Sequence, residues 1–435
     1  MKRLFLFSLA VLFLNVTARA QEKPHVFVGA EIIPITGAPI SNGVLVVHKG
    51  KIVAVGPAKT TQIPADAERH EVSGKVLMPG LVDSHSHIGG PGGGDSSGPF
   101  HPDTRVLDAI NVRDAGIQKA QAGGITTVNV MPGSGHLSSG QTLYLKLRDG
   151  QTIDDLLIFD ADGKMYGGLK MANGTNSIRP QPPFPGTRGK SAALVRDQFV
   201  KAQEYRDKVR RANGDREKMP PRDLAMETLV EVLDGKRVVH YHTHRHDDIL
   251  TVLRMSKEFG FKVVLHHVSE GWKVAKEIAA AKAPASIIVI DSPGGKMETM
   301  DASFANGGIL DRAGVLTGFH TDDGITDSRF FLRSAALAIR AGMSRDKALY
   351  GMTMANAKML DLDQRVGSLE VGKDADFILL SGDPLSVYTK VLETYVDGTK
   401  VFDRKDPKDY LYATGGYGAS RDQVMHLDCF DHDEE

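Results

Sequence analysis

The sequence predicts an α/β protein, in which a (β/α)₈ barrel of the TIM type is joined to a small β-sandwich domain formed from both chain ends. Two observations predict this fold. In the middle of the chain, short apolar runs alternate with longer stretches of helical spacing, a rhythm typical of βαβ units in a parallel sheet. Before and after that region, strand–turn–strand patterns replace the alternation. A chain of 435 residues is long enough for a barrel and one smaller domain.

The two β-rich ends have similar patterns. Residues 25–28 begin one strand, and residues 43–56 are typical of a hairpin that turns at Lys49-Gly50. Residues 375–380 and 394–402 repeat the strand–turn–strand pattern near the C-terminus. We therefore assign residues 21–78 plus 364–405 to the β-sandwich domain, 79–363 to the barrel and 406–435 to a C-terminal tail.

The barrel region can be divided into elements by its hydrophobic periodicity. Runs such as 287–290 show no polar alternation, because strands of a parallel sheet are buried on both faces. Enzymes with such a barrel keep their chemistry at the C-terminal ends of the strands, so polar residues there are the candidates for a site. We expect strands at 76–85, 125–131, 168–171, 237–243, 261–267, 286–290 and 314–321, a further strand between 131 and 169, and helices at 104–122, 247–259, 272–281, 328–341 and 345–357.

The first twenty residues are typical of a secretory signal peptide. Lys2 and Arg3 precede the apolar run of residues 4–16, and Ala18-Arg19-Ala20 gives the small-x-small pattern of a cleavage site. The run is shorter than the roughly 20 apolar residues that a membrane span needs, although an N-terminal membrane anchor is the alternative. We therefore expect export, to the periplasm or outside the cell, and no membrane contact after signal cleavage.

Composition narrows the classes of partner. A hydrophobic content of 41% and a charged content of 25% are ordinary for a soluble globular protein. The formal net charge of -1 gives no indication of nucleic acid or an anionic membrane as a partner. Cys429 is the only cysteine, which excludes an internal disulfide and argues against a thiolate metal site. The expected partner is a small-molecule or dipeptide-like substrate, and the sequence leaves open whether the chain forms a homo-oligomer.

Histidines gather at several of the expected strand ends. His85 and His87 lie two residues apart at the end of a strand, so both imidazoles face the same way. Neutral imidazoles and a carboxylate are ligands that zinc and similar ions prefer in catalytic sites. Because strand ends converge on the axis of a barrel, the pattern predicts a metal centre. The other strand ends contribute His240, His242, His244 and His246, then His266 and His267, and then His320 and Asp322.

One of these motifs resembles that of a known family. The stretch Gly-Leu-Val-Asp-Ser-His-Ser-His at residues 80–87 resembles the first-strand motif of the amidohydrolase superfamily. Residues 365–376, with Ser-Gly-Asp-Pro at 381–384 beyond them, resemble the segment by which those chains re-enter their small β-sandwich. Residues 123–127 fit the second strand. The resemblance covers about residues 25–403 and is nearest to the group of imidazolonepropionase-like and Xaa-Pro-dipeptidase-like proteins.

The resemblance implies a centre of one or two divalent ions, with Zn²⁺ as the first expectation. His85, His87 and Asp322 would hold one ion, while His242 and His267 match the ligands of the fifth and sixth strands. His244 and His320 share faces with ligands and would contact substrate or orient a ligand. The implied metal ligands are His85, His87, Lys170, His242, His267 and Asp322.

The lysine among these ligands is the least certain match. Relatives with two ions carry on the fourth strand a lysine whose amine holds CO₂ as a bridging carbamate. Lys170 is the better candidate, because a long helical stretch then leads to the strand of His242. Lys146 is the rival, because the same part of the chain must also supply a third strand. A lysine buried beside cations loses its proton readily, as carbamate formation requires.

The implied activity is hydrolysis of a C–N bond, in an amide, peptide-like or cyclic amide substrate, by metal-activated water. A divalent ion lowers the pKa of bound water toward about 7. Asp322 would accept the proton of that water and pass it to the leaving nitrogen, acting first as base and then as acid. A deaminase or a lactone hydrolase with the same centre is one alternative, because a fold resemblance does not separate these reactions. A catalytically silent barrel that only binds its ligand is the other.

Overall fold

The computed structural model describes residues 23–288 and 296–415. The expected signal peptide, Cys429 and the acidic end of the expected tail lie outside the described residues. Among the helices of the described ranges, none combines the length and the apolar character that crossing a membrane would require.

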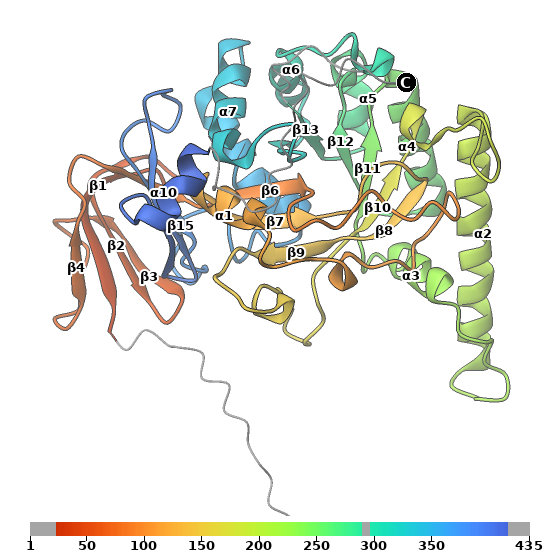
Figure 1. Ribbon diagram of the computed structural model, residues 1–435, viewed down its shortest axis with the longest axis horizontal. Coiled ribbons are helices and arrows are strands. Elements are labelled where there is room, and N and C mark those ends of the chain that lie inside the picture. Colours follow the sequence, from red (N-terminus) through yellow and green to blue (C-terminus); the bar gives the residue numbers. More distant parts are fainter. Residues whose placement is uncertain (1–22, 289–295, 416–435) are drawn as a thin grey trace, which may run out of the picture.

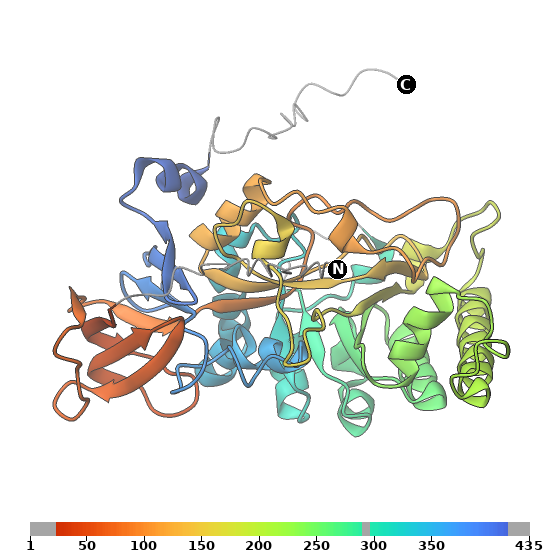
Figure 2. The same ribbon diagram turned by 90° about the horizontal axis from the view of Figure 1, so that it is seen from below.

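The two ends of the chain share one sheet. Its strand order is β17-β16-β15-β5-β1-β2-β3, and β4 pairs with β1. Because β5 lies between β1 and β15, the N-terminal strands and the C-terminal strands lie side by side, as Figures 1 and 2 show. The strands are β1 (His25–Ile32), β2 (Ile40–His48), β3 (Lys51–Pro57), β4 (Glu68–Glu71), β5 (Val76–Pro79), β15 (Phe377–Leu380), β16 (Val391–Val396) and β17 (Thr399–Asp403).

The hairpin of β2 and β3 turns at the predicted place. Lys49 and Gly50 have φ values of 50° and 76°. Positive φ at both central residues is what a two-residue hairpin turn of type I′ requires, and Gly adopts it without steric cost. The hydrophobic core of this sheet contains residues from both ends of the chain. Phe27 of β1 packs edge-on against Phe377 of β15 at 4.9 Å between ring centroids. The sandwich arrangement of this domain stays a prediction.

The remaining strands form an α/β part with two sheets, one of order β6-β7-β9 and one of order β14-β13-β12-β11-β10-β8. The peptide N–H of Asp322, beyond β14, donates to the carbonyl of His85 in β6 at 3.0 Å, so the outer strands of the two sheets are adjacent. The fold is of the TIM-barrel type, but the sheets do not close into one continuous barrel. The strands are β6 (Leu81–Ser86), β7 (Ile125–Val130), β8 (Ser138–Gln141), β9 (Leu143–Lys146), β10 (Leu169–Ala172), β11 (Val239–Thr243), β12 (Val263–His267), β13 (Ala285–Ile287) and β14 (Thr317–Phe319).

The third strand position differs from the expected parallel pattern. Strand β8 runs antiparallel to β10, and strand β9, separated from β8 only by Thr142, runs antiparallel to β7. The cause is the short connection of residues 131–137 between β7 and β8. A parallel crossover needs about a dozen residues or more, so the chain turns back on itself here instead.

Helices flank the strands, and Figure 1 shows α4 to α7 along the outer side of β11 to β13. The expected helix at 104–122 is wrong over its first half, because the α-helix there begins only after the capping carboxylate of Asp114. The expected helix at 345–357 is two helices that are separated at Met352 and Thr353. Part of the expected tail forms α10 instead. The helices are α1 (Ala115–Ala122), α2 (Arg188–Ala212), α3 (Leu224–Leu233), α4 (His246–Phe259), α5 (Ala275–Ala280), α6 (Asn306–Arg312), α7 (Phe331–Arg340), α8 (Arg345–Gly351), α9 (Met354–Met359) and α10 (Pro407–Thr414).

Candidate metal centre

His85, His87 and Asp322 converge at the end of β6. The Nδ1 atom of His87 donates to the carbonyl of Met131 at 2.7 Å, which leaves its Nε2 atom free to bind an ion. That Nε2 lies 3.0 Å from Oδ1 of Asp322, and Nε2 of His85 lies 3.4 Å from the same oxygen. The two Nε2 atoms are 3.4 Å apart, and the rings are inclined by 86°. Ligands about 2.0–2.1 Å from a tetrahedral ion lie roughly 3.3 Å from one another, so this spacing suits a single ion.

The backbone beyond β14 places Asp322. Its φ of 50° is in the left-handed region, which non-glycine residues rarely adopt, and such conformations gather at functional sites. The neighbouring Thr321 is fixed by the carboxylate of Asp83, which accepts from its peptide N–H at 3.1 Å and from its hydroxyl at 2.5 Å. Because Asp83 also accepts from the peptide N–H of His85 at 3.2 Å, it ties the end of β14 to β6.

The electrostatics keep Asp322 ionised. Burial raises its pKa, but the hydrogen bond and the charge of His87, together with smaller contributions from His320 and Lys170, lower the pKa to about 2. A carboxylate with that pKa carries a negative charge at neutral pH, so it can bind a cation or accept a proton.

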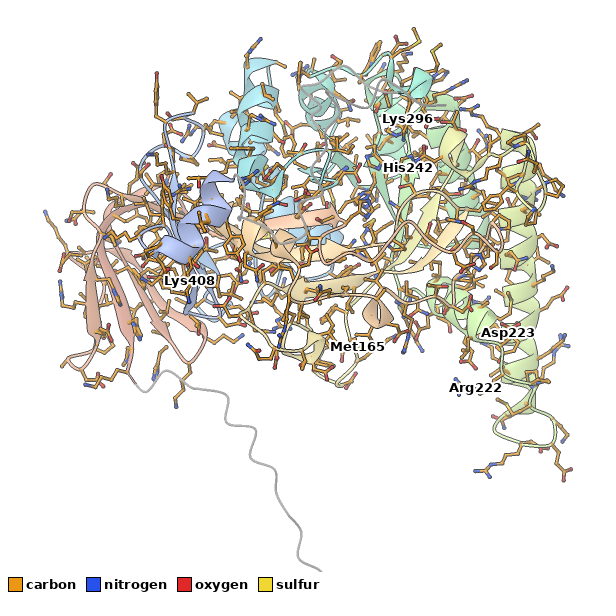
Figure 3. The ribbon with its side chains drawn as sticks, viewed as in Figure 1. Met165, Arg222, Asp223, His242, Lys296 and Lys408 are labelled. Atoms are coloured by element: carbon orange, nitrogen blue, oxygen red, sulfur yellow. The ribbon has the colours of Figure 1, made fainter. Side chains whose placement is uncertain are left out.

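A second group of histidines lies at the ends of β11 and β12. One ring nitrogen each of His242, His244 and His267 lies within 4.8 Å of the others. His242 lies in the interior of the α/β part, as Figure 3 shows. His267 departs from strand geometry with a φ of 69°, and its ring lies 4.3 Å from that of His242 between centroids. Regular alternation along β12 would place the rings of His266 and His267 on opposite faces, so it does not predict the position of the His267 ring that accompanies this left-handed backbone.

His320 supports this group. Its Nε2 atom lies 3.1 Å from Nδ1 of His267, and its Nδ1 atom lies 2.8 Å from the hydroxyl of Ser286. The structure therefore places His320 where it can orient His267. Its direct contact with a substrate stays a prediction.

The structure also brings together two histidines that the sequence did not single out as site residues. His240 and His242 are two residues apart in β11, so their side chains point to the same face of the sheet. His266 is the register partner of His242 in β12 and points to that face as well. His266 lies against His85 at 5.0 Å between ring centroids, and its Nε2 atom is 2.9 Å from Nδ1 of His240. The parallel register of β11 and β12 is the signal that could have placed His266 among the inner residues.

The two candidate lysines lie in different places. Lys170 is fully buried in β10, with its Nζ 3.3 Å from Nε2 of His85. Burial lowers the pKa of Lys170 to about 7. The Nζ atom of Lys146, in β9, instead lies 2.9, 2.8 and 2.7 Å from three carboxylates that flank strands β15 to β17. Burial alone would lower the pKa of Lys146, but these charges outweigh burial and raise it above its usual value. The carboxylates belong to Asp374, Asp376 and Asp397.

The donor set fits a divalent metal ion. Burial holds the pKa of His85, His242 and His267 well below the usual value, so these rings are neutral and keep a lone pair for a cation. Burying a polar atom without a partner costs about 1–3 kcal/mol, and ligation would remove that cost for each such nitrogen that binds an ion. Among the histidines of these two groups and their neighbours, the buried ring nitrogens without a hydrogen-bond partner are Nδ1 of His85, both nitrogens of His242, Nε2 of His244, Nδ1 of His266 and Nε2 of His267.

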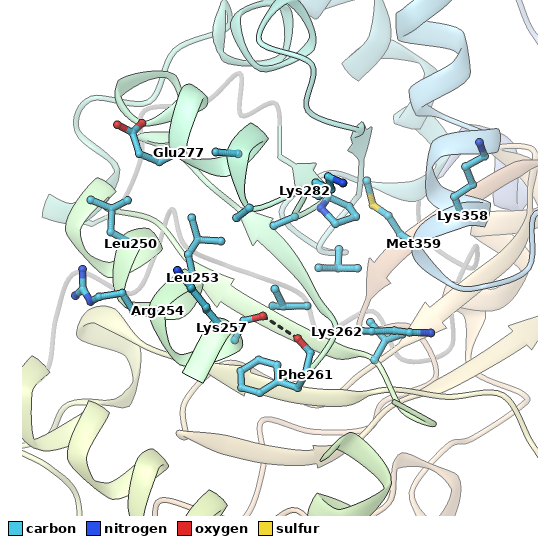
Figure 4. Close-up of a pocket in the computed structure, with 18 of the residues that line it drawn as sticks. Leu250, Leu253, Arg254, Lys257, Phe261, Lys262, Glu277, Lys282, Lys358 and Met359 are labelled. Carbon is cyan, nitrogen blue, oxygen red and sulfur yellow. Dashed lines mark hydrogen bonds between the residues drawn. The ribbon is translucent and has the colours of Figure 1, made fainter. Parts of the chain in front are cut away.

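A separate cavity of about 800 Å³ lies elsewhere in the α/β part. Figure 4 shows its lining, with Phe261 and Lys262 before β12 and with Lys358 and Met359 of α9. Phe261 and Lys262 stand at the N-terminal end of β12, whereas His242 and His267 stand at the C-terminal ends of β11 and β12. The cavity is therefore not part of the candidate centre, and its side chains can serve as controls.

Comparison with known proteins finds similar sequences and folds. The amidohydrolase family matches residues 303–401. The crystal structure of an amidohydrolase from Thermotoga maritima MSB8 is 35% identical, covers 87% of this chain and 100% of that chain, and superposes with a TM-score of 0.81.

Two curated proteins are similar over most of this chain. The amidohydrolase tasK of Hapsidospora irregularis is 27% identical over 394 residues, which are 83% of this chain, although the match spans only 40% of that protein. The imidazolonepropionase of Rhizobium rhizogenes is 26% identical over 393 residues, which are 82% of this chain and 91% of that protein.

Proposed function

This chain belongs to the amidohydrolase superfamily, in the imidazolonepropionase-like group, and we propose that it hydrolyses a C–N bond of a small amide, peptide-like or cyclic amide substrate. It is a hydrolase acting on carbon–nitrogen bonds, and we propose that the centre described above holds a divalent metal. One observation carries the proposal. His85, His87 and Asp322 direct two ring nitrogens and one carboxylate oxygen at a common point, with separations of 3.0–3.4 Å.

His85, His87 and Asp322 would hold a divalent ion at that point, for which we propose Zn²⁺, and such an ion would supply an activated water and polarise the bond to be cleaved. Residues of the chain itself position the ligands and transfer the proton. The carbonyl of Met131 fixes the ring of His87, so its free nitrogen stays directed at the centre. Asp322 is ionised at neutral pH and has a second oxygen, which lies 3.9 Å from His267 rather than against His87. That carboxylate can take a proton from the attacking water and deliver it to the leaving nitrogen.

We further propose that Lys170 carries a carboxyl group derived from CO₂. In that step the lone pair of the free amine attacks the carbon of CO₂, an N–C bond forms while one C=O π pair moves to an oxygen, and one N–H proton passes to solvent water. The pKa of about 7 leaves a large share of the amine unprotonated at neutral pH, and its 3.3 Å distance from His85 would place the new oxygens at the centre. Carbon-13 NMR after exposure to labelled bicarbonate tests this, and a carbamate signal absent from Lys170→Met supports the assignment.

Two proposals concern the whole chain. The charged and apolar pattern of residues 1–20 supports export and signal cleavage, which N-terminal sequencing of the protein from its native host would test. The adjacency of β6 and β14 supports closure of the strands into a (β/α)₈ barrel, and the sheet shared by both chain ends supports a β-sandwich domain.

The function is tested with the full-length chain, loaded with Zn²⁺, on a panel of dipeptides, N-acyl amino acids and cyclic amides. We expect hydrolysis of one of these classes that depends on metal and is lost in His87→Ala. Lys262→Ala, in the separate cavity, should leave the rate unchanged. Ammonia release from aminopurines, or hydrolysis of lactones alone, would replace the proposal with a deaminase or a lactone hydrolase. A metal-loaded protein that turns over none of the panel would point to a binding protein and overturn the proposal.

A further inference from the structure

A further group of side chains of the metal-binding type lies on the sheet shared by both chain ends. Strands β1 and β4 run parallel there, and their register pairs His25 with Glu68 and Phe27 with His70. Side chains two residues apart on a strand point to the same face, and register partners share that face, so all four point the same way. The pairing of the two strands thus brings two imidazoles and one carboxylate together.

The ligand atoms of this group lie close to one another. Nδ1 of His25 lies 3.0 Å from Nε2 of His70, and Oε1 of Glu68 lies 3.9 Å from the same Nε2. One ligand atom of each residue lies within 4.8 Å of the other two. Ligand atoms of one zinc ion lie roughly 3–4 Å apart, so these three atoms can share an ion after small side-chain adjustments. The two ring nitrogens attract each other at 3.0 Å only with a proton or a cation between them.

Packing holds the ring of His70 in place. It stacks on the ring of Phe27 at 4.6 Å between centroids, with 15° between the ring planes, and it is inclined by only 11° to the ring of His25. Phe27 is 1% exposed and belongs to the hydrophobic core, so the surface under His70 is rigid. Burial, and then the neighbouring His25, hold the pKa of His70 below its usual value. The ring of His70 is therefore neutral at neutral pH and has a lone pair for a cation.

The charges around the group favour a cation. The side chains of His70 and Glu68 are 31% and 60% exposed, so an ion can reach them from solution. The charges of Glu68, Glu393 and Lys400 all act on His70. Lys400 lies 3.3 Å from Glu393 and 2.7 Å from Asp403, so it already serves two carboxylates and does not neutralise Glu68. The excess negative charge beside the two imidazoles attracts a positive ion.

We propose that His25, Glu68 and His70 bind a Zn²⁺ ion that joins β4 to β1, at a site separate from the candidate metal centre. Two imidazoles and one carboxylate, with water at the open position, are a donor set that zinc takes in proteins. Figure 1 shows β1 and β4 at one end of the molecule, away from β11 and β12. In the described part of the chain β4 pairs with β1 alone, so the ion adds a cross-link at this strand. Because it binds the folded arrangement, it stabilises the sheet.

The first test is the zinc content of the full-length chain, by equilibrium dialysis against buffered Zn²⁺ in the micromolar range and mass spectrometry of the metal. We expect His25→Ala and His70→Ala each to bind one ion fewer than the wild type. His48→Ala is the matched control, because His48 ends β2 of the same sheet and lies outside the group. It should keep the wild-type zinc content.

The second test locates the ion in the wild-type chain, so it holds even if the alanine variants fold poorly. Zn²⁺ should slow modification of His25 and His70 by diethyl pyrocarbonate, measured by peptide mass spectrometry, and should leave the rate at His48 unchanged. In Glu68→Gln the same protection should require more Zn²⁺. Equal zinc content in the wild type and both alanine variants would overturn the site, as would protection that is absent in the wild type or unchanged in Glu68→Gln.

Discussion

The Nζ atom of Lys170 lies 3.3 Å from the Nε2 atom of His85, and both side chains are fully buried. A charged ammonium at that place would repel a metal ion bound to His85, so the amine must be neutral or carboxylated when the centre is loaded. The electrostatics agree, because burial lowers the pKa of Lys170 to about 7. Metal binding at His85 should therefore depend on the protonation state of Lys170, and through it on the pH of the solution.

The first prediction concerns stability of the metal-free protein. The pKa of Lys170 falls from 10.5 to about 7 on folding, so between these values the unfolded chain binds more protons than the folded chain. Stability should therefore rise as pH increases from about 7 to about 10. Lys170→Met removes the titrating group and should flatten that rise. Urea denaturation at several pH values measures it, and equal slopes for the two proteins would contradict the buried, depressed lysine.

The second prediction concerns Asp322. Asp322→Asn keeps the shape of the side chain but removes the negative charge and the proton acceptor. We expect turnover to fall by about 10²- to 10⁴-fold, the usual contribution of general acid–base catalysis. Asp361→Asn, in the cavity of Figure 4, is the control and should keep wild-type turnover. An Asp322→Asn protein with bound metal and an unchanged rate would rule out the role of Asp322 as base.

The third prediction separates the two lysines. Lys146→Met leaves the carboxylates of Asp374, Asp376 and Asp397 without their shared buried cation. Breaking such a buried ion pair costs about 3–5 kcal/mol, so the free energy of unfolding should fall by that order. Because Lys146 contacts these carboxylates and lies apart from the candidate metal centre, the metal content of the folded protein should not change. Loss of metal without loss of stability would contradict this placement.

Much of the centre could be predicted from the sequence, because it depends on local spacing. The alternation of His85 and His87 along one strand places both rings on one side, and this is a property of any strand. Asp322 could be placed near them because strand ends converge in a barrel. The sequence favours Lys170 over Lys146 through the helical stretch that leads to the strand of His242, but the contacts of the two amines could not be predicted, since they depend on which carboxylates of a distant segment reach each lysine.

Other features follow from tertiary structure that periodicity does not encode. The left-handed backbone of His267 breaks the alternation of β12, so its ring lies beside that of His242. Which nitrogen of His244 is free depends on Ser269, which lies beyond the end of the next strand. The antiparallel direction of β8 and β9 follows from the short connection before β8 and not from the composition of the strands.

Anomalous X-ray scattering at the zinc edge, from crystals of the metal-loaded protein, would locate the ions directly. We expect one peak between Nε2 of His85, Nε2 of His87 and Oδ1 of Asp322, at about 2.0–2.2 Å from each ligand atom. An active, metal-loaded protein without a peak at His85, His87 and Asp322 would contradict the assignment of the centre.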